Sequence, residues 1–181
     1  LSGLDKIVET CISEKVAAIA ICFLHSYRNG DHERQGRDFI APKLPGVHIS
    51  LSSDILPELQ EFERASTTVV NAYVAPLIAE YLANLRRKLD HIKALAPILV
   101  MQSNGGLVPS QTASERPVSI IESGPAAGVV AALRASLDAG QQNVITLDMG
   151  GTTTKASIIE NGEILRARVY EVGGPVSVSS R

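Results

Sequence analysis

The sequence predicts an α/β protein in which helices cover a sheet that contains parallel strands. Aromatic residues make up only 4% of the chain and tryptophan is absent, whereas alanine, valine and isoleucine are frequent, a composition that suits layered packing. Residues 4–15 carry helical spacing of apolar side chains, a helix over residues 32–43 is predicted from the cap and stop signals around it, and residues 16–25 and 47–52 are predicted as strands. Helices that alternate with strands in this order are typical of parallel sheets.

The apolar run over residues 16–25 fits the period of either a helix or a strand. Its length and the turn sequence over residues 26–30 favour a buried parallel strand. Asn29 or Asp31 is expected to cap the helix that follows, because short polar side chains accept hydrogen bonds from the first N–H groups of a helix. A proline and a glycine at residues 45–46 are expected to end it.

Pro57 is expected to open a long helix. Its larger side chains recur at 3.6-residue spacing and therefore fall on one face; they are Phe62, Ser66, Val69, Tyr73, Leu77, Tyr81 and Leu85. Pro76 lies inside this pattern. Since proline lacks a backbone N–H and clashes with the preceding turn, a kink or a break is expected near Val74.

The second half of the chain mixes short strands with one helix. Strands are predicted over residues 96–102 and 118–122, and a helix over residues 123–137 that Gly140 ends. The polar, glycine-rich residues 103–106 stop the first of these strands. The sequence thus continues the α/β pattern.

The chain is predicted to end in antiparallel strands. Residues 143–148 are expected to form a strand, followed by a hairpin whose strands cover residues 153–159 and 163–172. Asn-Gly at residues 161–162 is the usual signal for the tight turn between two such strands.

Composition excludes several classes of function. A net charge of −2 and a pI of about 6.1 leave no basic surface for a phosphate backbone, so no nucleic-acid partner is expected. Cys11 and Cys22 without a Cys/His cluster disfavour a disulfide scaffold or zinc site and fit a cytoplasmic location. The longest apolar run is too short to span a bilayer, so no membrane partner is expected. We expect an internal piece of a longer protein, because the chain starts in helix-like sequence without methionine.

The most informative segment for function is residues 144–154, where a predicted strand ends in Asp148. Glycines let the chain turn tightly and present N–H groups to an anion, and threonine hydroxyls bind phosphate oxygens. A carboxylate at a strand end can hold Mg²⁺ through water. The spacing matches neither a P-loop nor a Rossmann fingerprint. The sequence predicts a phosphate and magnesium cradle, or alternatively an ordinary turn, formed by Asp148, Gly150, Gly151, Thr152, Thr153 and Thr154.

Two other glycine-containing segments are candidates for binding. Residues 122–128 place small residues, Ser123 and Gly124 among them, in the first turn of a helix, where N–H groups and the helix dipole attract anions. Tight helix packing is the favoured alternative there. Residues 101–106 follow a strand, which is where α/β proteins place ligands, or they form an ordinary turn. The candidate substrate contacts in this loop are Ser103, Asn104, Gly105 and Gly106.

Together these segments resemble the hydantoinase A/oxoprolinase family, which includes related subunits of ATP-dependent ketone carboxylases. The resemblance covers nearly the whole chain in order, and five motifs in series are specific where one would be weak. The matching stretches are residues 23–29 with 32–34, 61–73, 101–106, 123–128 and 147–154.

The resemblance implies a place in the actin/sugar-kinase/heat-shock ATPase superfamily, in which two ribonuclease-H-like lobes close on ATP. Residues 1–140 would be the later part of lobe one, with the long helix and an interlobe connecting helix over residues 123–137. Residues 141–181 would be the opening β-hairpin of lobe two, with the phosphate motif. The first phosphate motif, the adenosine-binding segment and most of lobe two would lie outside this chain, so catalysis by this piece alone is not expected.

The resemblance also implies a function. It points to an ATP-dependent hydrolase that opens cyclic amides, such as a hydantoin or 5-oxoproline, by phosphorylating the ring carbonyl. ATP and magnesium would be the cofactors, and Asp148 the catalytic and metal-holding residue. Partners would be the missing parts of the same protein and a hydantoinase B type subunit. The alternatives are a ketone carboxylase subunit or a non-enzymatic nucleotide-gated scaffold.

Lys155 departs from the family pattern, which has an acidic residue after Thr-x-Thr. A lysine there can contact phosphate, but a protonated lysine cannot bind a cation, so the metal role of this position does not carry over. This departure keeps the scaffold alternative open.

Other charged residues have ordinary interpretations. Glu61, Glu63 and Arg64 are interpreted as an exposed ion-paired helix face, with orientation of a site as the alternative. The basic residues 86–88 are interpreted as a solvated helix end, with an anion patch as the alternative.

Overall fold

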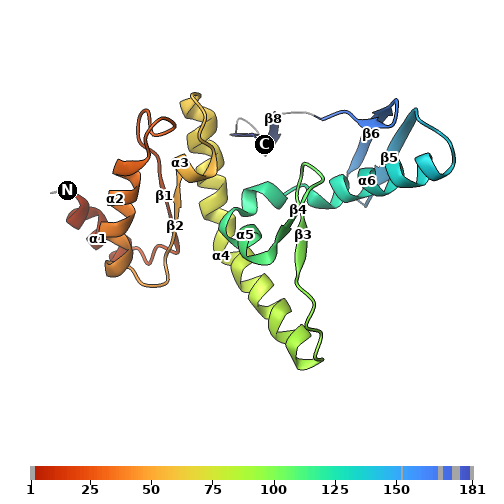
Figure 1. Ribbon diagram of the computed structural model, residues 1–181. Helices are drawn as coiled ribbons and strands as arrows, with labels where there is room; N and C mark the ends of the chain where they lie inside the picture. Colours follow the sequence, from red (N-terminus) through yellow and green to blue (C-terminus); the bar gives the residue numbers. More distant parts are fainter. Residues whose placement is uncertain (1–2, 152, 167–168, 173–175, 180–181) are drawn as a thin grey trace. The chain divides into compact units, whose positions relative to one another are not determined.

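The computed structural model describes residues 3–151, 153–166, 169–172 and 176–179 (Figure 1). The chain forms two compact units. Unit 1 comprises Leu1–Leu95, Ser114–Val118 and Val169–Ser179, and unit 2 comprises most of the remainder, Ala96–Ala113 and Ser119–Arg168. These units are not the two lobes expected above, and a lobe boundary near residue 140 remains a prediction.

Unit 1 contains the predicted parallel β-α-β arrangement. β1 and β2 pair in parallel, from Ala18 opposite His48 to Ile21 opposite Leu51. The core beside them consists of buried apolar side chains from the helices and strands, namely Val8, Ile21, Ile40, Leu44 and Leu51. The elements in order are α1 (Leu4–Ser13), β1 (Ala18–Ile21), α2 (Asp31–Ile40), a 3₁₀ turn (Ala41–Lys43), β2 (His48–Leu51), α3 (Ser52–Ile55) and α4 (Glu61–His91).

The start of α2 differs in detail from the prediction. Gly30 is the N-cap residue and provides no side chain for the cap, so neither Asn29 nor Asp31 occupies that position. The Asn29 side chain still acts one residue earlier, since its Oδ1 accepts a hydrogen bond of 2.8 Å from the backbone N–H of Asp31. The Pro45–Gly46 end of this segment is confirmed, and Gly46 has a φ of +86°.

α4 is a single helix of 31 residues, drawn from yellow to light green in Figure 1. It begins at Glu61 rather than at Pro57, and it runs through Pro76 without the break allowed for near Val74. Proline removes one intrahelical hydrogen bond, and in a helix of this length the neighbouring turns keep theirs, so the helix continues.

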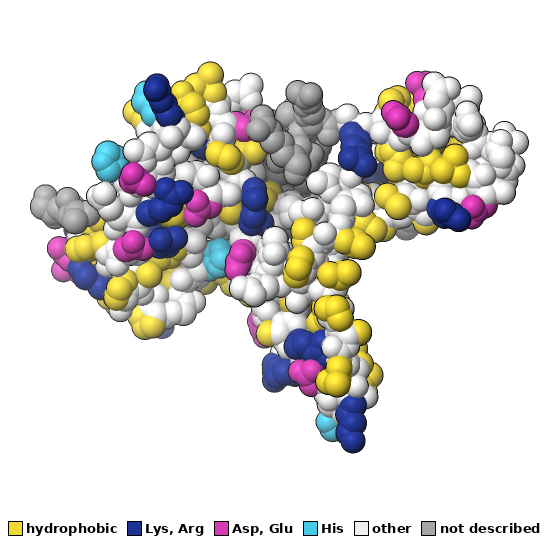
Figure 2. Space-filling model, viewed as in Figure 1, with side chains coloured by type: hydrophobic (Ala, Val, Ile, Leu, Met, Phe, Trp, Pro, Cys, Tyr) yellow, Lys and Arg dark blue, Asp and Glu magenta, His cyan; other side chains and the backbone are white. Residues whose placement is uncertain are grey.

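The buried side of α4 is polar and the apolar side is exposed. The side that packs on β1 and β2 carries Arg64, Thr67, Thr68, Asn71, Ala72 and Ala75. On the predicted apolar face Phe62 is 58% exposed and Tyr73 is 77% exposed. Hydrophobic side chains lie at the surface in both units in Figure 2. The apolar face of α4 is therefore not the face that holds unit 1 together.

Unit 2 combines a small hairpin, a helix and an antiparallel sheet. β3 (Leu99–Met101) and β4 (Leu107–Pro109) form the hairpin, and α6 (Ser123–Asp138) packs on a sheet in the order β5-β6-β7. The sheet strands are β5 (Val144–Met149), β6 (Thr154–Glu160) and β7 (Glu163–Ile164). The predicted helix over residues 123–137 is confirmed, with Gly140 at φ +74° after it.

Two predicted strands are wrong in part. Residues 118–122 do not form a strand, because Pro117–Ile120 is a 3₁₀ helix and the Val118 N–H donates to Asn71 Oδ1 at 3.1 Å. The strand predicted over residues 163–172 is divided, since only Glu163–Ile164 pairs with β6. Its later part, β8 (Val169–Val172), pairs with β9 (Val176–Ser179) in unit 1. The helix α5 (Ser110–Glu115) was not predicted.

The hairpin turn between β6 and β7 is confirmed. Asn161 and Gly162 both adopt left-handed φ values, 52° and 77°, as a tight two-residue turn requires. In the part of the chain that the structure describes, none of the helices has the length and apolar character needed to cross a membrane.

Candidate functional site

The predicted phosphate-binding turn joins β5 to β6 at the surface of unit 2. Asp148, Gly150, Gly151, Thr153 and Thr154 are all exposed, and Thr152 lies outside the described residues. The turn is held by a hydrogen bond of 3.0 Å from the Gly150 N–H to the Thr153 carbonyl oxygen. A ligand can therefore reach the backbone of this turn without any rearrangement of unit 2.

The two glycines of this turn are not required by their surroundings. A methyl group added at Gly150 would come no closer than 3.8 Å to another atom, and at Gly151 it would meet no described atom within 4 Å. Neither belongs to the described glycines with left-handed φ. Because these glycines have no side chain, a ligand can approach their backbone closely, as a phosphate cradle needs.

Strand register places Asp148 and Lys155 opposite each other on one face of the β5–β6 pair. The same face carries Ile159, which is 1% exposed and lies on the side that α6 covers. Next to the turn between β5 and β6, Lys155 Nζ forms an ion pair with Glu122 Oε2 and donates a hydrogen bond to it. Glu122 is the N-cap residue of α6, so the turn and the start of α6 lie together.

The β3–β4 turn reaches the same place. Ser103 Oγ accepts a hydrogen bond of 3.2 Å from the Glu122 N–H, and the Ser103 N–H donates to the Ser119 carbonyl at 2.8 Å. The three glycine-rich segments that the sequence singled out therefore meet around Glu122 within unit 2. Sequence reasoning named Glu122 only as the first residue of a motif and missed it as the meeting point.

The β3–β4 turn is itself held by internal hydrogen bonds. The Gly105 N–H donates to the Gln102 carbonyl at 2.9 Å, and the Gly106 N–H donates to Asn104 Oδ1 at 2.8 Å. Gly105 has a φ of +85°, and a methyl group there would lie 3.1 Å from Val130 Cγ2 of α6. Packing and turn geometry account for these residues, and substrate contact by Ser103 or Asn104 remains a prediction.

Ser123 and Gly124 occupy the first turn of α6. Ser123 is half-buried and Gly124 is exposed, and a methyl group at Gly124 would meet no described atom within 4 Å. The first N–H groups of any helix lack an acceptor within the helix, and the dipole there favours anions. The geometry fits the predicted role of these residues next to phosphate.

Asp148 is the candidate magnesium ligand at this turn. Within the described residues, no group of three His, Cys, Asp or Glu side chains could hold a metal ion by itself. Asp148 faces Lys155 rather than a second carboxylate. One carboxylate fits a Mg²⁺ ion that arrives with phosphate oxygens and keeps its waters, which is the common mode for nucleotide-bound magnesium.

A second polar cluster was not found by sequence reasoning. Glu33 of α2 is 0% exposed; its Oε1 accepts hydrogen bonds from Ser52 Oγ at 2.6 Å and the Phe23 N–H at 2.9 Å. Its Oε2 accepts from the Ser53 N–H at 2.8 Å. Burial raises the pKa of Glu33, but these hydrogen bonds outweigh it, so the pKa lies below its ordinary value.

Arg64 of α4 completes this cluster at the carboxyl ends of β1 and β2. It is 0% exposed and donates to Ser52 Oγ at 3.2 Å, the Glu58 carbonyl at 2.7 Å and the Phe23 carbonyl at 3.1 Å. The interpretation of Arg64 as part of an exposed face is therefore wrong. The 33, 36, 40 spacing on the core face of α2 was the signal that could have revealed the partner cluster.

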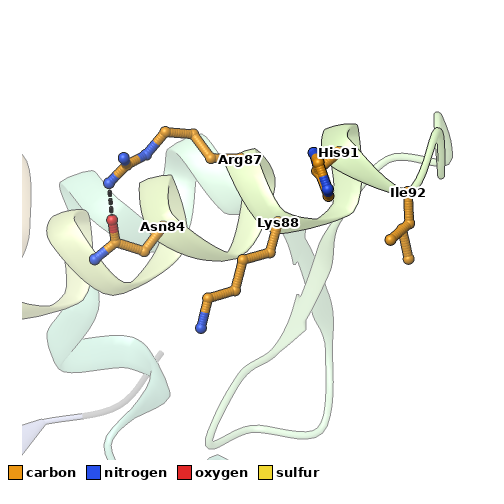
Figure 3. Close-up of a pocket in the computed structure, with 5 residues that line it drawn as sticks. All are labelled: Asn84, Arg87, Lys88, His91 and Ile92. Atoms are coloured by element: carbon orange, nitrogen blue, oxygen red, sulfur yellow. Dashed lines mark hydrogen bonds between the residues drawn. The ribbon is translucent and has the colours of Figure 1, made fainter.

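A hollow at the end of α4 is lined by side chains of that helix end alone (Figure 3). Arg87 donates a hydrogen bond to Asn84 Oδ1, and Arg86 pairs with Asp90 at 2.8 Å. Arg86 also donates to the Ala94 carbonyl beyond the helix. These contacts match a solvated helix end with cations near the carbonyl groups, as expected for residues 86–88. The lining residues are Asn84, Arg87, Lys88, His91 and Ile92.

Comparison with solved structures supports a mixed α/β fold of known type. A nucleotide-free structure of acetone carboxylase, described for ATP-dependent acetone carboxylation, matches 99% of this chain with a TM-score of 0.83. The sequence identity is 24%, and the match covers 25% of that chain. The likeness shows the fold and nothing of the activity.

The chain belongs to the hydantoinase/oxoprolinase family, whose family model matches residues 64–180. An uncharacterised protein of Methanocaldococcus jannaschii is 44% identical over 96% of this chain and 25% of its own length. Caprolactamase subunit alpha of Pseudomonas jessenii is 38% identical over 82% of this chain and 21% of its own. The 5-oxoprolinase of Saccharomyces cerevisiae is 36% identical over 90% of this chain and 12% of its own length. The chain thus spans a quarter or less of the length of these relatives.

Proposed function

We propose that this chain is part of an ATP-dependent enzyme that opens cyclic amides of the hydantoin or 5-oxoproline type, and that it holds the phosphates of the nucleotide. The observation that carries the proposal is the convergence around Glu122 of the turn after β5, the start of α6 and the β3–β4 turn. The relatives named caprolactamase and 5-oxoprolinase supply the cyclic amide, since both names denote ring amides.

Each residue of the turn has a defined role in this proposal. The exposed turn at Gly150 and Gly151 lies against the phosphate oxygens. The Gly150 N–H stays bonded to the Thr153 carbonyl, and the Gly151 N–H and the hydroxyls of residues 152–154 donate to the phosphate. Asp148 holds the magnesium ion through water, and the ion supplies charge stabilisation on the phosphates when bound. Ser123 and Gly124 offer helix N-terminal N–H groups from the other side.

The chemistry follows from the low reactivity of a ring amide. The ring carbonyl oxygen takes the terminal phosphoryl group of ATP and ADP leaves, which converts the oxygen into a good leaving group. Water then attacks the activated carbon, and the ring C–N bond breaks as the ring nitrogen takes up a proton. A second water cleaves the resulting acyl phosphate into a carboxylate and free phosphate. We further propose the two-lobed arrangement, with residues 1–140 in lobe one and residues 141–181 opening lobe two, so that closure about residues 123–137 excludes water until substrate is bound.

A ketone carboxylase subunit is the second candidate, favoured by sequence similarity to the acetone carboxylase beta subunit of Xanthobacter autotrophicus, which is 29% identical over 84% of this chain. It would use the same phosphate site to activate a ketone or bicarbonate. In either case a partner subunit of the hydantoinase B type is proposed, because one relative is named as the alpha subunit of its enzyme.

The test measures ATP hydrolysis by the full-length protein, with and without its co-purifying partner subunit, in the presence of hydantoin, 5-oxoproline, caprolactam or acetone. Stimulation by one of the ring amides, with the ring-opened product in equal amount to ADP, is the expected result. Stimulation by acetone with bicarbonate and by none of the ring amides would replace the proposal with the carboxylase. ATP binding without stimulation by any compound would favour a nucleotide-gated scaffold.

A further inference from the structure

We propose that Lys155 is a phosphate-contacting residue of this nucleotide site, and that Glu122 holds its ammonium group in position. The inference rests on the proposed function and adds a determinant of nucleotide affinity that lies outside the glycine turn. It concerns an amino group at the position where the family pattern has an acidic residue.

The position of Lys155 is defined by the strand register. It lies opposite Asp148, directly after the last threonine of the turn, and both side chains share the face that α6 covers. Its side chain is 39% exposed, so the ammonium group is at the edge of the site and not inside the core. A phosphate bound at the turn would lie within reach of a side chain of this length from the adjoining residue.

The chemistry of the ammonium group allows two partners at once. Lysine has three N–H donors, and the contact with Glu122 Oε2 occupies one of them. Charge also favours the second contact. Asp148 and Glu122 are both acidic, and without Lys155 a nucleotide phosphate would meet two carboxylates at this end of the sheet. The ammonium group offsets that repulsion, which a carboxylate at position 155 would increase.

The alternative is that the Lys155–Glu122 pair only fastens α6 to the sheet. An exposed pair of this kind contributes little to stability, typically about 0–1 kcal/mol. The two roles differ in one respect that can be measured. A purely structural pair needs only opposite charges, apart from the cost of placing a lysine at a helix N-terminus, whereas the proposed phosphate contact requires the positive charge at position 155.

The experiment measures ATP affinity of the full-length protein by titration calorimetry with magnesium present, alongside thermal unfolding without nucleotide. The variants are Lys155→Met, Glu122→Gln, and the exchange Glu122→Lys with Lys155→Glu. We expect Lys155→Met and the exchange to weaken ATP binding about tenfold or more, as loss of a charge-assisted contact does. Glu122→Gln should keep ATP affinity within about threefold, because the amide oxygen still accepts a hydrogen bond from the ammonium group and keeps it in position.

Two results would overturn the inference while leaving the proposed function intact. One is wild-type ATP affinity in Lys155→Met. The other is recovery of ATP affinity in the charge exchange, which would show that a positive charge at position 155 is not required. Absence of ATP binding by the wild-type protein itself would instead contradict the proposed function.

Discussion

The segments after β1 and β2 in unit 1 and the turn after β5 in unit 2 both lie within family motifs, yet they use their polar groups in opposite ways. In unit 1, Glu33, Ser52 and Arg64 are fully buried, and Ser52 links the other two because it donates a hydrogen bond to Glu33 and accepts one from Arg64. In unit 2, Gly150 and Gly151 are exposed, and no described atom lies close enough to either of them to require a glycine. A motif can thus mark a structural network as readily as a binding site.

This contrast gives a criterion for choosing between the two. Where burial and internal partners explain the residue types, as at Arg64, the motif is accounted for by folding. Where they do not, as at Gly151, we propose an external partner as the reason for the residue type. The β3–β4 turn belongs with the first kind, because φ and packing explain Gly105.

The largest expected effect breaks the network in unit 1. Arg64→Met should lower the free energy of unfolding by about 3–5 kcal/mol, since it leaves buried acceptors without a donor. The matched control is Arg34→Met, because Arg34 is half exposed and pairs with the exposed Asp31 and Asp54; it should cost about 1 kcal/mol or less. Urea unfolding of the full-length protein measures both. Equal losses in the two variants would show that burial of Arg64 does not set the difference.

The next effect separates the two glycine turns. Gly105→Ala should cost about 1–2 kcal/mol of stability, because alanine is strained at a left-handed φ, while ATP affinity is kept. Gly151→Ala should leave stability within about 0.5 kcal/mol and weaken ATP binding about tenfold, since its methyl group enters the cradle. Urea unfolding and titration calorimetry on the same samples give the pair of values. The reverse pattern would assign the binding role to the β3–β4 turn.

The smallest effect concerns the pH dependence of stability. The pKa of Glu33 lies below its ordinary value of 4.5 in the folded protein, so the unfolded chain takes up the proton first as pH falls. The stability that Glu33 contributes is therefore complete above 4.5 and is lost progressively below it. The difference in stability between wild type and Glu33→Gln should narrow over that range. Burial lowers the pKa of His48 below its ordinary value of 6.5 in both proteins. Both therefore lose the same stability from His48 as the pH falls below 6.5, and this loss cancels in the difference between them.

A wild-type curve parallel to that of Glu33→Gln below pH 4.5 would contradict the account of Glu33. Urea midpoints measured at several pH values between 3 and 6 are sufficient, because this range extends about one pH unit or more above and below the ordinary pKa of Glu33.

Local sequence signals were enough to predict β1, β2, α2 and α6, because run length, alternation or start and stop residues mark each of them. They failed on the faces of α4, since spacing identifies an apolar face but does not say what covers it. They failed at residues 118–122 because a distant side chain, Asn71, takes the Val118 N–H that a strand partner would need. The turn after β5 was predicted from residue types alone.

The meeting point of the site could not be predicted. Glu122, Ser103 and Lys155 are separated by 19 and 33 positions, and only tertiary packing brings them together. No local pattern distinguishes Glu122 from an ordinary N-cap residue. Likewise Arg64 has the neighbours of an exposed helical arginine in sequence, and its burial follows from the loops that α4 packs against.

The reversed polarity of α4 offers a practical route to studying unit 1 in solution. Replacing the exposed apolar side chains of its outer side with polar ones would reduce non-specific association. It would spare the hydrogen-bonded inner side, because the two sets of side chains do not overlap. A soluble version of the unit would let NMR spectroscopy follow Arg64 and Glu33 directly. The positions to change are Phe62, Val69, Tyr73, Leu77 and Tyr81, each more than half exposed.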